Sequence, residues 1–295
     1  MIFGGRVAYS MLAFALAVLL NGCAGLPTGR FDALAAASRG VDASTAEADS
    51  EIVKLTRRFM IFSPAPGPYK IDSFAPVIEV QGQRRDFDFG PRLAPRKAAL
   101  DVLVSYTEAV AAFAKKDYQG DLDQATQSLG GSLQSLAGHA SASAEVKQGA
   151  GVLATAVNGL GRAIIDQMRK AALRKAMEEA SPGIAQIATF VKDINVLAST
   201  AVTVMRDDML RTANKLTAAD GVARLQLNES VEGVIVESHA IVVRLKQITV
   251  AVEAIKPAHD EIREALAHDE RTSLDKLKAL VAEAKRLQSF YSTLK

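Results

Sequence analysis

The chain has 295 residues, and its 35 basic and 33 acidic side chains leave a net charge of only +2. This balance gives no basic surface of the kind that binds nucleic acid, so nucleic acid is not an expected partner. Hydrophobic residues make up 49% of the sequence, which is typical of a folded chain, and the single cysteine, Cys23, leaves no pair for an internal disulfide.

The first 22 residues have the form of a secretory signal peptide. Arg6 precedes an uncharged apolar run over residues 7–20, and Gly22 stands just before Cys23. A basic start, a short apolar stretch and a small residue before the cut are features of exported proteins. The run is shorter than the ~20 residues that cross a bilayer, so we expect cleavage rather than a retained membrane helix.

The end of this segment resembles the lipobox of bacterial lipoproteins, on the residues Leu20, Gly22 and Cys23. Asn21 is a less usual residue in its position. The resemblance implies cleavage between Gly22 and Cys23, and a lipid with three acyl chains on the Cys23 sulfur, which is enough for stable attachment. Ala24 replaces the Asp that retains such proteins in the inner membrane. The expected location is therefore the outer membrane, with the body facing the periplasm; the inner membrane and the cell surface remain alternatives.

Residues 23–43 are expected to form the acylated cysteine and a flexible tether, because they are small and weakly patterned. A helical bundle is expected over residues 44–295. Ser44 and Glu47 have the capping-box spacing, which predicts the first helix start at Ser44. Apolar residues then recur every three or four positions, as on one face of a helix: Ile52, Leu55, Phe59 and Phe62.

A proline-rich insertion is expected over residues 63–95, which hold six of the nine prolines. Such a density excludes a long helix. Residues 77–80 and 86–89 predict two short strands, because the second alternates polar and apolar side chains. We expect a small β-hairpin attached to the bundle.

The rest of the chain carries helical spacing almost throughout. Ser181-Pro182 predicts a helix start, and Pro257 predicts the bend or end of another helix. The expected helices cover residues 95–117, 122–136, 146–180, 181–215, 218–255 and 273–295. The predicted fold class is therefore all-α, an elongated antiparallel bundle of long helices with near-heptad apolar faces.

Two glycine-rich triplets, Gly149-Ala150-Gly151 and Gly159-Leu160-Gly161, lie inside a helical pattern. A phosphate-binding loop needs a preceding strand, so these triplets favour close helix–helix approach. The apolar stretches 149–161 and 241–252 raise the alternative of membrane insertion. Charged residues interrupt both stretches well before ~20 residues, which favours a buried core.

One candidate partner surface combines basic and aromatic residues near the end of the insertion: Arg84, Arg85, Phe87, Phe89 and Arg92. Arg and aromatic side chains are enriched where proteins bind one another. The alternative is that the phenylalanines close one end of the bundle while the arginines stay in solvent.

One weak candidate metal site is Asp260, Glu264 and His268, which recur every four residues along one helical face. The alternative is a solvated polar face with pairs four residues apart. No motif of a known catalytic or cofactor site is present, so we expect no enzyme and no cofactor.

These features favour a lipid-anchored periplasmic bundle that acts as an interaction scaffold or accessory subunit of a cell-envelope assembly, with a protein partner. A helical membrane-perturbing or pore-forming protein is the first alternative. A metal- or small-ligand-binding bundle is the second.

Overall fold

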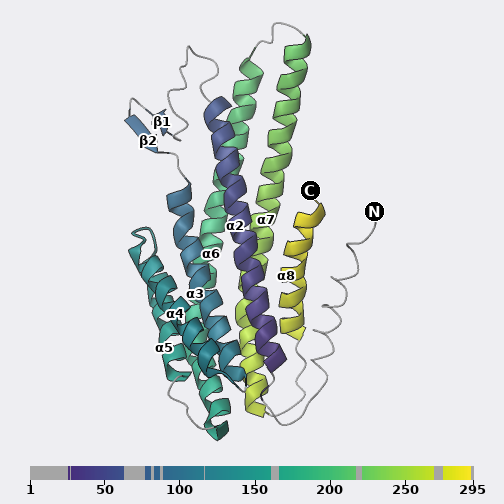
Figure 1. The fold of residues 1–295 in the computed structure, drawn as a ribbon. Helices are drawn as coiled ribbons and strands as arrows, with labels where there is room; N and C mark the ends of the chain where they lie inside the picture. The colour runs from purple at the N-terminus through teal and green to yellow at the C-terminus, as the bar shows by residue number, and fades with distance from the viewer. Residues whose placement is uncertain are drawn as a thin grey trace.

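The chain forms an elongated all-α bundle in which long helices run up and down one axis (Figure 1), as predicted. The computed structural model describes residues 26, 28–62, 77–80, 83–86, 89–115, 117–160, 166–216, 221–268 and 275–293. The predicted signal peptide over residues 1–22 and the predicted lipid site at Cys23 lie outside the described residues.

Seven helices and two short strands make up the described part of the chain. The helices are α2 (Thr28–Phe62), α3 (Gly90–Ala114), α4 (Gln119–Gly138), α5 (Ala144–Leu160), α6 (Asp166–Lys215), α7 (Gly221–His268) and α8 (Asp275–Thr293). The strands are β1 (Val77–Val80) and β2 (Gln83–Asp86).

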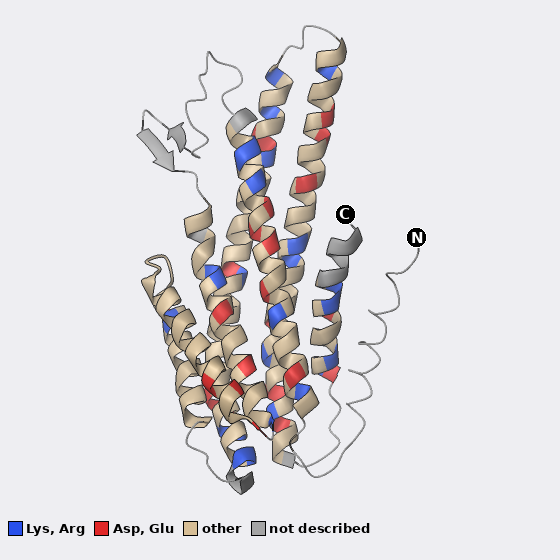
Figure 2. Ribbon diagram, in the orientation of Figure 1, with Lys and Arg blue, Asp and Glu red and all other residues tan. Residues whose placement is uncertain are grey.

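The central helices pack as antiparallel neighbours. Between α2 and α3, Arg39 pairs with Glu108 at 2.8 Å and Asp42 pairs with Lys97 at 3.1 Å, so the residue numbers of the two helices run in opposite directions. Pairs from α6 to α7 show the same reversal, because Ser181 contacts Asp260 and the later Lys192 contacts the earlier Glu253. Charges of both signs are interspersed along these helices (Figure 2).

The prediction of a tether up to residue 43 is wrong, because α2 already begins at Thr28. Its buried face runs from Phe31 to Phe59 with strictly alternating spacings of three and four: Phe31, Leu34, Ser38, Val41, Thr45, Ala48, Ile52, Leu55 and Phe59. Ser38 and Thr45 interrupt the apolar pattern, and their hydroxyls donate to the carbonyls of Leu34 and Val41 at 3.0 and 2.9 Å. Ser44 is therefore a buried residue inside a helix and not a helix cap.

The predicted helix start at Pro182 is also wrong, because α6 continues through this residue. At Pro257, where a bend or an end was predicted, the helix does not end, because α7 continues to His268. A proline inside a helix costs roughly 3 kcal/mol. Full burial of the neighbouring apolar side chains, such as Ile184 beside Pro182 and Ile255 beside Pro257, offsets this cost by roughly 1.5–3 kcal/mol each. The helix predicted over residues 146–180 is instead divided, since α5 ends at Leu160 and α6 begins at Asp166.

The predicted β-hairpin is present, but its second strand comes earlier than expected. β1 matches the predicted residues, whereas β2 covers Gln83–Asp86 instead of residues 86–89. Val80 pairs with Gln83 and Val77 pairs with Asp86, so only two residues connect the strands. Such short connections favour glycine, and Gly82 lies there in the sequence.

A contact between two glycines brings α5 and α6 unusually close. A Cβ atom added to Gly183 would lie 2.6 Å from the carbonyl oxygen of Gly149, and one added to Gly149 would lie 3.1 Å from the carbonyl oxygen of Gly183. The prediction of close helix approach is thus confirmed at Gly149. At Gly151 and Gly159, by contrast, an added Cβ meets no atom within 4 Å.

We therefore expect Gly183→Ala to lower the free energy of unfolding by about 1–3 kcal/mol, because α5 and α6 must separate to admit the methyl group. Gly151→Ala is the matched control on α5, and it should stabilise the protein by up to about 1 kcal/mol through helix propensity. Urea denaturation followed by circular dichroism measures both changes. Equal effects of the two substitutions would contradict the close contact.

Candidate functional site

A buried arginine on α3 connects four helices of the bundle. Arg96 is fully buried, and its guanidinium contacts the carboxylate of Asp49 on α2 and the side-chain oxygen of Asn195 on α6. The amide nitrogen of Asn195 donates in turn to the hydroxyl of Thr249 on α7 at 3.0 Å. Burial lowers the pKa of Arg96 to about 10, so the side chain still carries its charge at neutral pH.

A second buried arginine lies near the first. Arg244 on α7 is 1% exposed at its side chain and pairs with Glu51 on α2. Together, Arg96 and Arg244 place two cations inside the bundle, each beside a carboxylate of α2. Removing one partner of such a buried pair generally costs about 3–5 kcal/mol, because the other charge is left without compensation.

A third arginine caps the C-terminal end of α3. Arg169 on α6 donates to the carbonyl oxygen of Phe113 at 2.6 Å and also to that of Lys115. Its guanidinium also lies over the ring of Tyr118, 4.7 Å from the ring centre. The last carbonyls of a helix have no partner within the helix, so a cation here satisfies them and favours the helix dipole.

A chain of polar side chains crosses the lower half of the bundle, from α3 through α7 to α6. Tyr106 and Nε2 of His259 are 2.8 Å apart, and Nδ1 of His259 lies 3.5 Å from Asp260. Asp260 accepts hydrogen bonds from Ser181 at 2.9 Å and from Lys256 at 2.6 Å. Tyr106 and His259 are both fully buried.

Serine, histidine and aspartate are the residue types of a hydrolytic triad, but here they contact one another in a different order. In a triad the serine hydroxyl donates to the imidazole, which removes its proton. Here Ser181 donates to Asp260 instead, and the imidazole of His259 contacts the phenol of Tyr106. The arrangement therefore joins three helices and does not activate Ser181 as a nucleophile.

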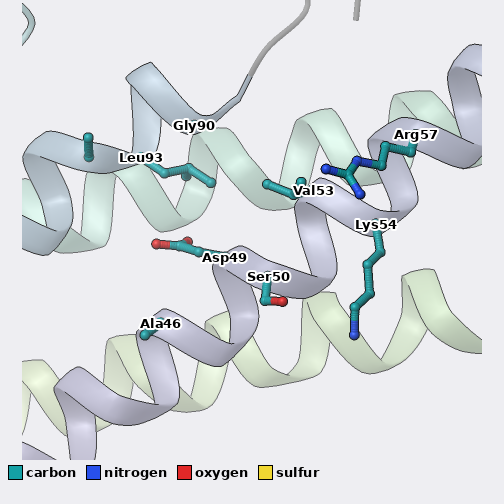
Figure 3. A pocket seen from close by; sticks show the side chains of 9 residues that line it. Ala46, Asp49, Ser50, Val53, Lys54, Arg57, Gly90 and Leu93 are labelled. Atoms are coloured by element: carbon teal, nitrogen blue, oxygen red, sulfur yellow. The ribbon is translucent and has the colours of Figure 1, made fainter. Parts of the chain in front are cut away.

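An open cleft of about 430 Å³ lies between α2 and the first turns of α3. Figure 3 shows its α2 wall, and Gly90 and Leu93 on the α3 side. The lining residues are Ala46, Asp49, Ser50, Val53, Lys54, Arg57, Gly90, Leu93 and Ala94. Lys54 and Arg57 are exposed and form no ion pair with another described residue, whereas Asp49 is engaged by Arg96. Carboxylate and phosphate groups are the usual counterparts of such cations.

The predicted partner surface is described only in part. Arg84 and Arg85 lie in β2, and Phe87 falls outside the described residues. Arg92 lies in the first turn of α3, although its side chain is not among those described. Phe89 is buried and belongs to the core, so for this residue the packing alternative is the one observed. The same first turn of α3 forms one wall of the cleft.

The structure describes the side chains of two of the three predicted metal ligands, Asp260 and Glu264. Asp260 is engaged by Lys256, Ser181 and His259, while Glu264 is exposed and lies 3.8 Å from Arg263. The side chain of His268 is outside the described residues. Among the described residues, no group of three or more potential metal-ligating His, Cys, Asp or Glu side chains is found.

Four buried polar residues were not predicted from the sequence: Arg96, Asn195, Arg244 and His259. Each one stands where the apolar periodicity of its helix predicts a core residue. Asn195, for example, continues the buried series of Ile184, Val191 and Ala198. A charged or amide side chain in such a position indicates a buried polar contact, and this was the available signal.

Comparison with known proteins gives no relative: no protein-family model, no curated protein and no solved structure matches this chain.

The polar chain through His259 makes stability depend on pH. Burial lowers the pKa of His259 below its ordinary value of 6.5, so the imidazole stays neutral in the folded state while the unfolded chain takes up a proton. Partial burial disfavours the charge of Asp260, but the nearby imidazole of His259 and the hydrogen bonds from Lys256 and Ser181 outweigh this and lower its pKa. The free energy of unfolding is therefore highest near neutral pH. It falls below about pH 6.5, where His259 takes up a proton in the unfolded chain, and falls further below about pH 3.8, where Asp260 does the same.

We expect the free energy of unfolding to fall as the pH drops from 6.5 to 5, by at most about 1.4 kcal/mol per pH unit from His259. His259→Gln keeps a hydrogen-bonding group for Tyr106 but cannot titrate, so it should flatten this slope. His239→Gln removes an exposed histidine and is the control. Chemical denaturation at a series of pH values measures the slopes; an unchanged slope in His259→Gln would refute the assignment.

Proposed function

We propose that this protein is a lipid-anchored scaffold of the bacterial cell envelope. A lipid on Cys23 would hold it to the outer membrane, and the helical body would bind a protein partner in the periplasm. The lipobox-like residues Leu20, Gly22 and Cys23 support the anchor. The length of the body supports the scaffold role, since the 50 residues of α6 extend about 75 Å.

The early start of α2 supports a defined orientation at the membrane. Only residues 24–27 separate Cys23 from Thr28, and five residue steps reach at most about 18 Å. The end of the bundle where α2 begins would therefore sit close to the membrane. The far ends of α6 and α7, near Lys215 and Gly221, lie at the other end of the bundle and would project away from it (Figure 1).

The observation that carries the scaffold role is where the exposed apolar side chains lie. The described residues include eight exposed large apolar side chains, and all eight are on α6 or α7: Val196, Leu197, Val204, Val222, Leu225, Ile235, Val236 and Val250. Single exposed apolar residues are ordinary on any protein surface. Their restriction to two adjacent helices supports the proposal that these helices contact another macromolecule.

We expect Cys23→Ser to release the protein from the membrane fraction, because a single hydroxyl side chain cannot carry the thioether lipid. Cell fractionation with immunoblotting measures the release, and mass spectrometry of the native protein should find the lipid mass on Cys23. Ala24→Asp is the matched control, which should remain lipidated but move to the inner membrane. Membrane retention and unchanged processing of Cys23→Ser would refute the anchor.

A second candidate function is membrane insertion, and one observation favours it. Among the described helices, Arg169–Lys215 of α6 is long and apolar enough to cross a membrane. Only 33% of its most apolar 18-residue segment is buried. Core helices of bundles pass the same test of length and composition. Dye leakage from liposomes separates the two functions, since a scaffold leaves the vesicles intact.

A further inference from the structure

The line along which α5 packs on α6 continues beyond the end of α5. A Cβ atom added to Gly183 would meet Leu153, and one added to Gly149 would meet Gln186, so the two helices are antiparallel. Helix α5 begins at Ala144, which lies only about one and a half turns before Gly149. Helices α4 and α5 therefore lie beside the lower half of α6, and the upper half of α6 extends past them (Figure 1).

Above α5, the same side of α6 carries only apolar residues. Residues seven apart lie on the same side of a packed helix, so the position of Gly183 repeats at residues 190, 197 and 204. We call the five apolar residues on this side, spaced by four, three, four and three, the upper stripe: Phe190, Ile194, Leu197, Ala201 and Val204. Leu197 is 50% exposed and Val204 is 58% exposed, and the other three are half-buried. Such spacing is typical of a helix that packs against another helix.

The neighbouring helices contact other sides of α6. Asn195, which contacts Arg96 on α3 and Thr249 on α7, is buried and does not belong to the upper stripe. Lys192 pairs with Glu253 on α7, on the side of α6 opposite the stripe. Helix α8 packs on α2 and α7. The upper stripe is therefore the part of the α5 packing line that the described helices leave open.

The exposed edge beside the upper stripe is acidic. Asp193 is exposed and forms no ion pair with another described residue, while Asp207 pairs with the adjacent Arg206. Neither lysine nor arginine occurs among the six residues of this edge: Thr189, Asp193, Val196, Thr200, Thr203 and Asp207. A helix bound to the stripe would meet the free carboxylate of Asp193 along this edge, which favours a basic residue at that point.

We propose that the upper stripe binds an amphipathic α-helix of another protein, which lies end to end with α5 on the same side of α6. The bound helix has apolar residues at alternating spacings of three and four, and a lysine or arginine that faces Asp193. About 16 residues, or about 24 Å of helix, cover the line from the end of α5 to Val204. The argument for a helix is continuity, since a helix of this chain already packs on the lower part of the line.

A second copy of this chain does not fit the upper stripe. Two copies anchored in one membrane stand parallel, and a two-fold contact uses the same surface on both copies. In each copy α5 occupies the same side of α6 directly below the stripe, so the two α5 helices would collide before the stripes met. A single helix of another protein meets no such obstacle.

This inference rests on the proposed function, because it names the kind of partner that an interaction scaffold binds. The two are tested separately, since membrane release of Cys23→Ser reports on the anchor alone. If the stripe stays unoccupied, the anchored scaffold needs another binding surface. If the anchor fails, the stripe can still bind a helix.

Photo-crosslinking in intact cells tests the occupant of the upper stripe. The full-length protein with Leu197→p-benzoylphenylalanine should crosslink to another protein on irradiation, because the benzophenone group lies at the centre of the stripe. Mass spectrometry identifies the crosslinked segment, which should be an amphipathic helix with the spacing and basic residue described above. Val222→p-benzoylphenylalanine on α7, where Val222 is 67% exposed, is the matched control and should not give this product.

A synthetic peptide of the crosslinked segment then measures the contribution of the apolar residues. Leu197→Ser with Val204→Ser should weaken binding of the labelled peptide at least about tenfold in fluorescence anisotropy, because apolar area buried on binding is lost. Ile235→Ser with Val236→Ser, an exposed apolar pair on α7, is the control and should change nothing. Unchanged circular dichroism shows that each variant is folded.

The acidic edge is tested with the same peptide. Asp193→Lys should weaken binding roughly two- to fivefold, and replacing the facing basic residue of the peptide by glutamate should recover the loss. Glu178→Lys, an exposed charge reversal beside the lower half of α6, is the control.

A helix of a different protein at Leu197, with loss of binding confined to the stripe variants, supports the proposal. It is overturned if position 197 gives no crosslink, or if it crosslinks only to lipid, to a second copy or to residues 63–76 of the same chain. A crosslinked segment that is not an amphipathic helix also overturns it, as does equal weakening by the two serine pairs. Failure of the charge exchange overturns the predicted basic residue.

Discussion

The guanidinium of Arg96 is the contact on which the arrangement of the long helices depends. It lies in the interior and reaches Asp49 on α2 and Asn195 on α6, and Asn195 extends the contact to Thr249 on α7. The cost of removing a cation from water is high, and it is offset only when every partner is in place. Helices α2, α3, α6 and α7 must therefore meet at one level.

This requirement fixes the register of the four helices. Their apolar faces alone do not fix it. An apolar face with spacings of three and four repeats itself, so a helix that slides by two turns finds similar contacts again. A shift of even one turn, about 5.4 Å, would move Asp49 or Asn195 away from Arg96 and leave a buried charge unpaired. The second polar chain, from Tyr106 through His259 to Asp260, constrains the other half of the bundle. Fixed register also holds the exposed apolar residues of α6 and α7 in constant relative positions.

The all-α fold was predictable, because burial imposes a periodicity on each helix that the sequence displays directly. The start of α2 was not predicted, since Ser38 and Thr45 look polar in sequence yet lie buried with their hydroxyls bonded within the helix. Pro182 was predicted to start a helix because local propensity does not include tertiary packing. This packing stabilises α6 on both sides of the proline. The cleft was not predictable either, since its two walls come from α2 and α3. Sequence periodicity reports burial, but it does not report which partner a buried polar group finds.

Distances between spin labels on α2 and α6 test this account most directly. Labels at Lys54 and Thr200, both exposed, report the register of the two helices by double electron–electron resonance. The account predicts one narrow distance distribution in the native protein. It predicts a broad or shifted distribution, at unchanged helix content, when Arg96, Asp49 and Asn195 are replaced together by Met, Leu and Leu. A narrow distribution at the native distance in that variant would contradict the account, because the apolar faces would then fix the register without the buried charge.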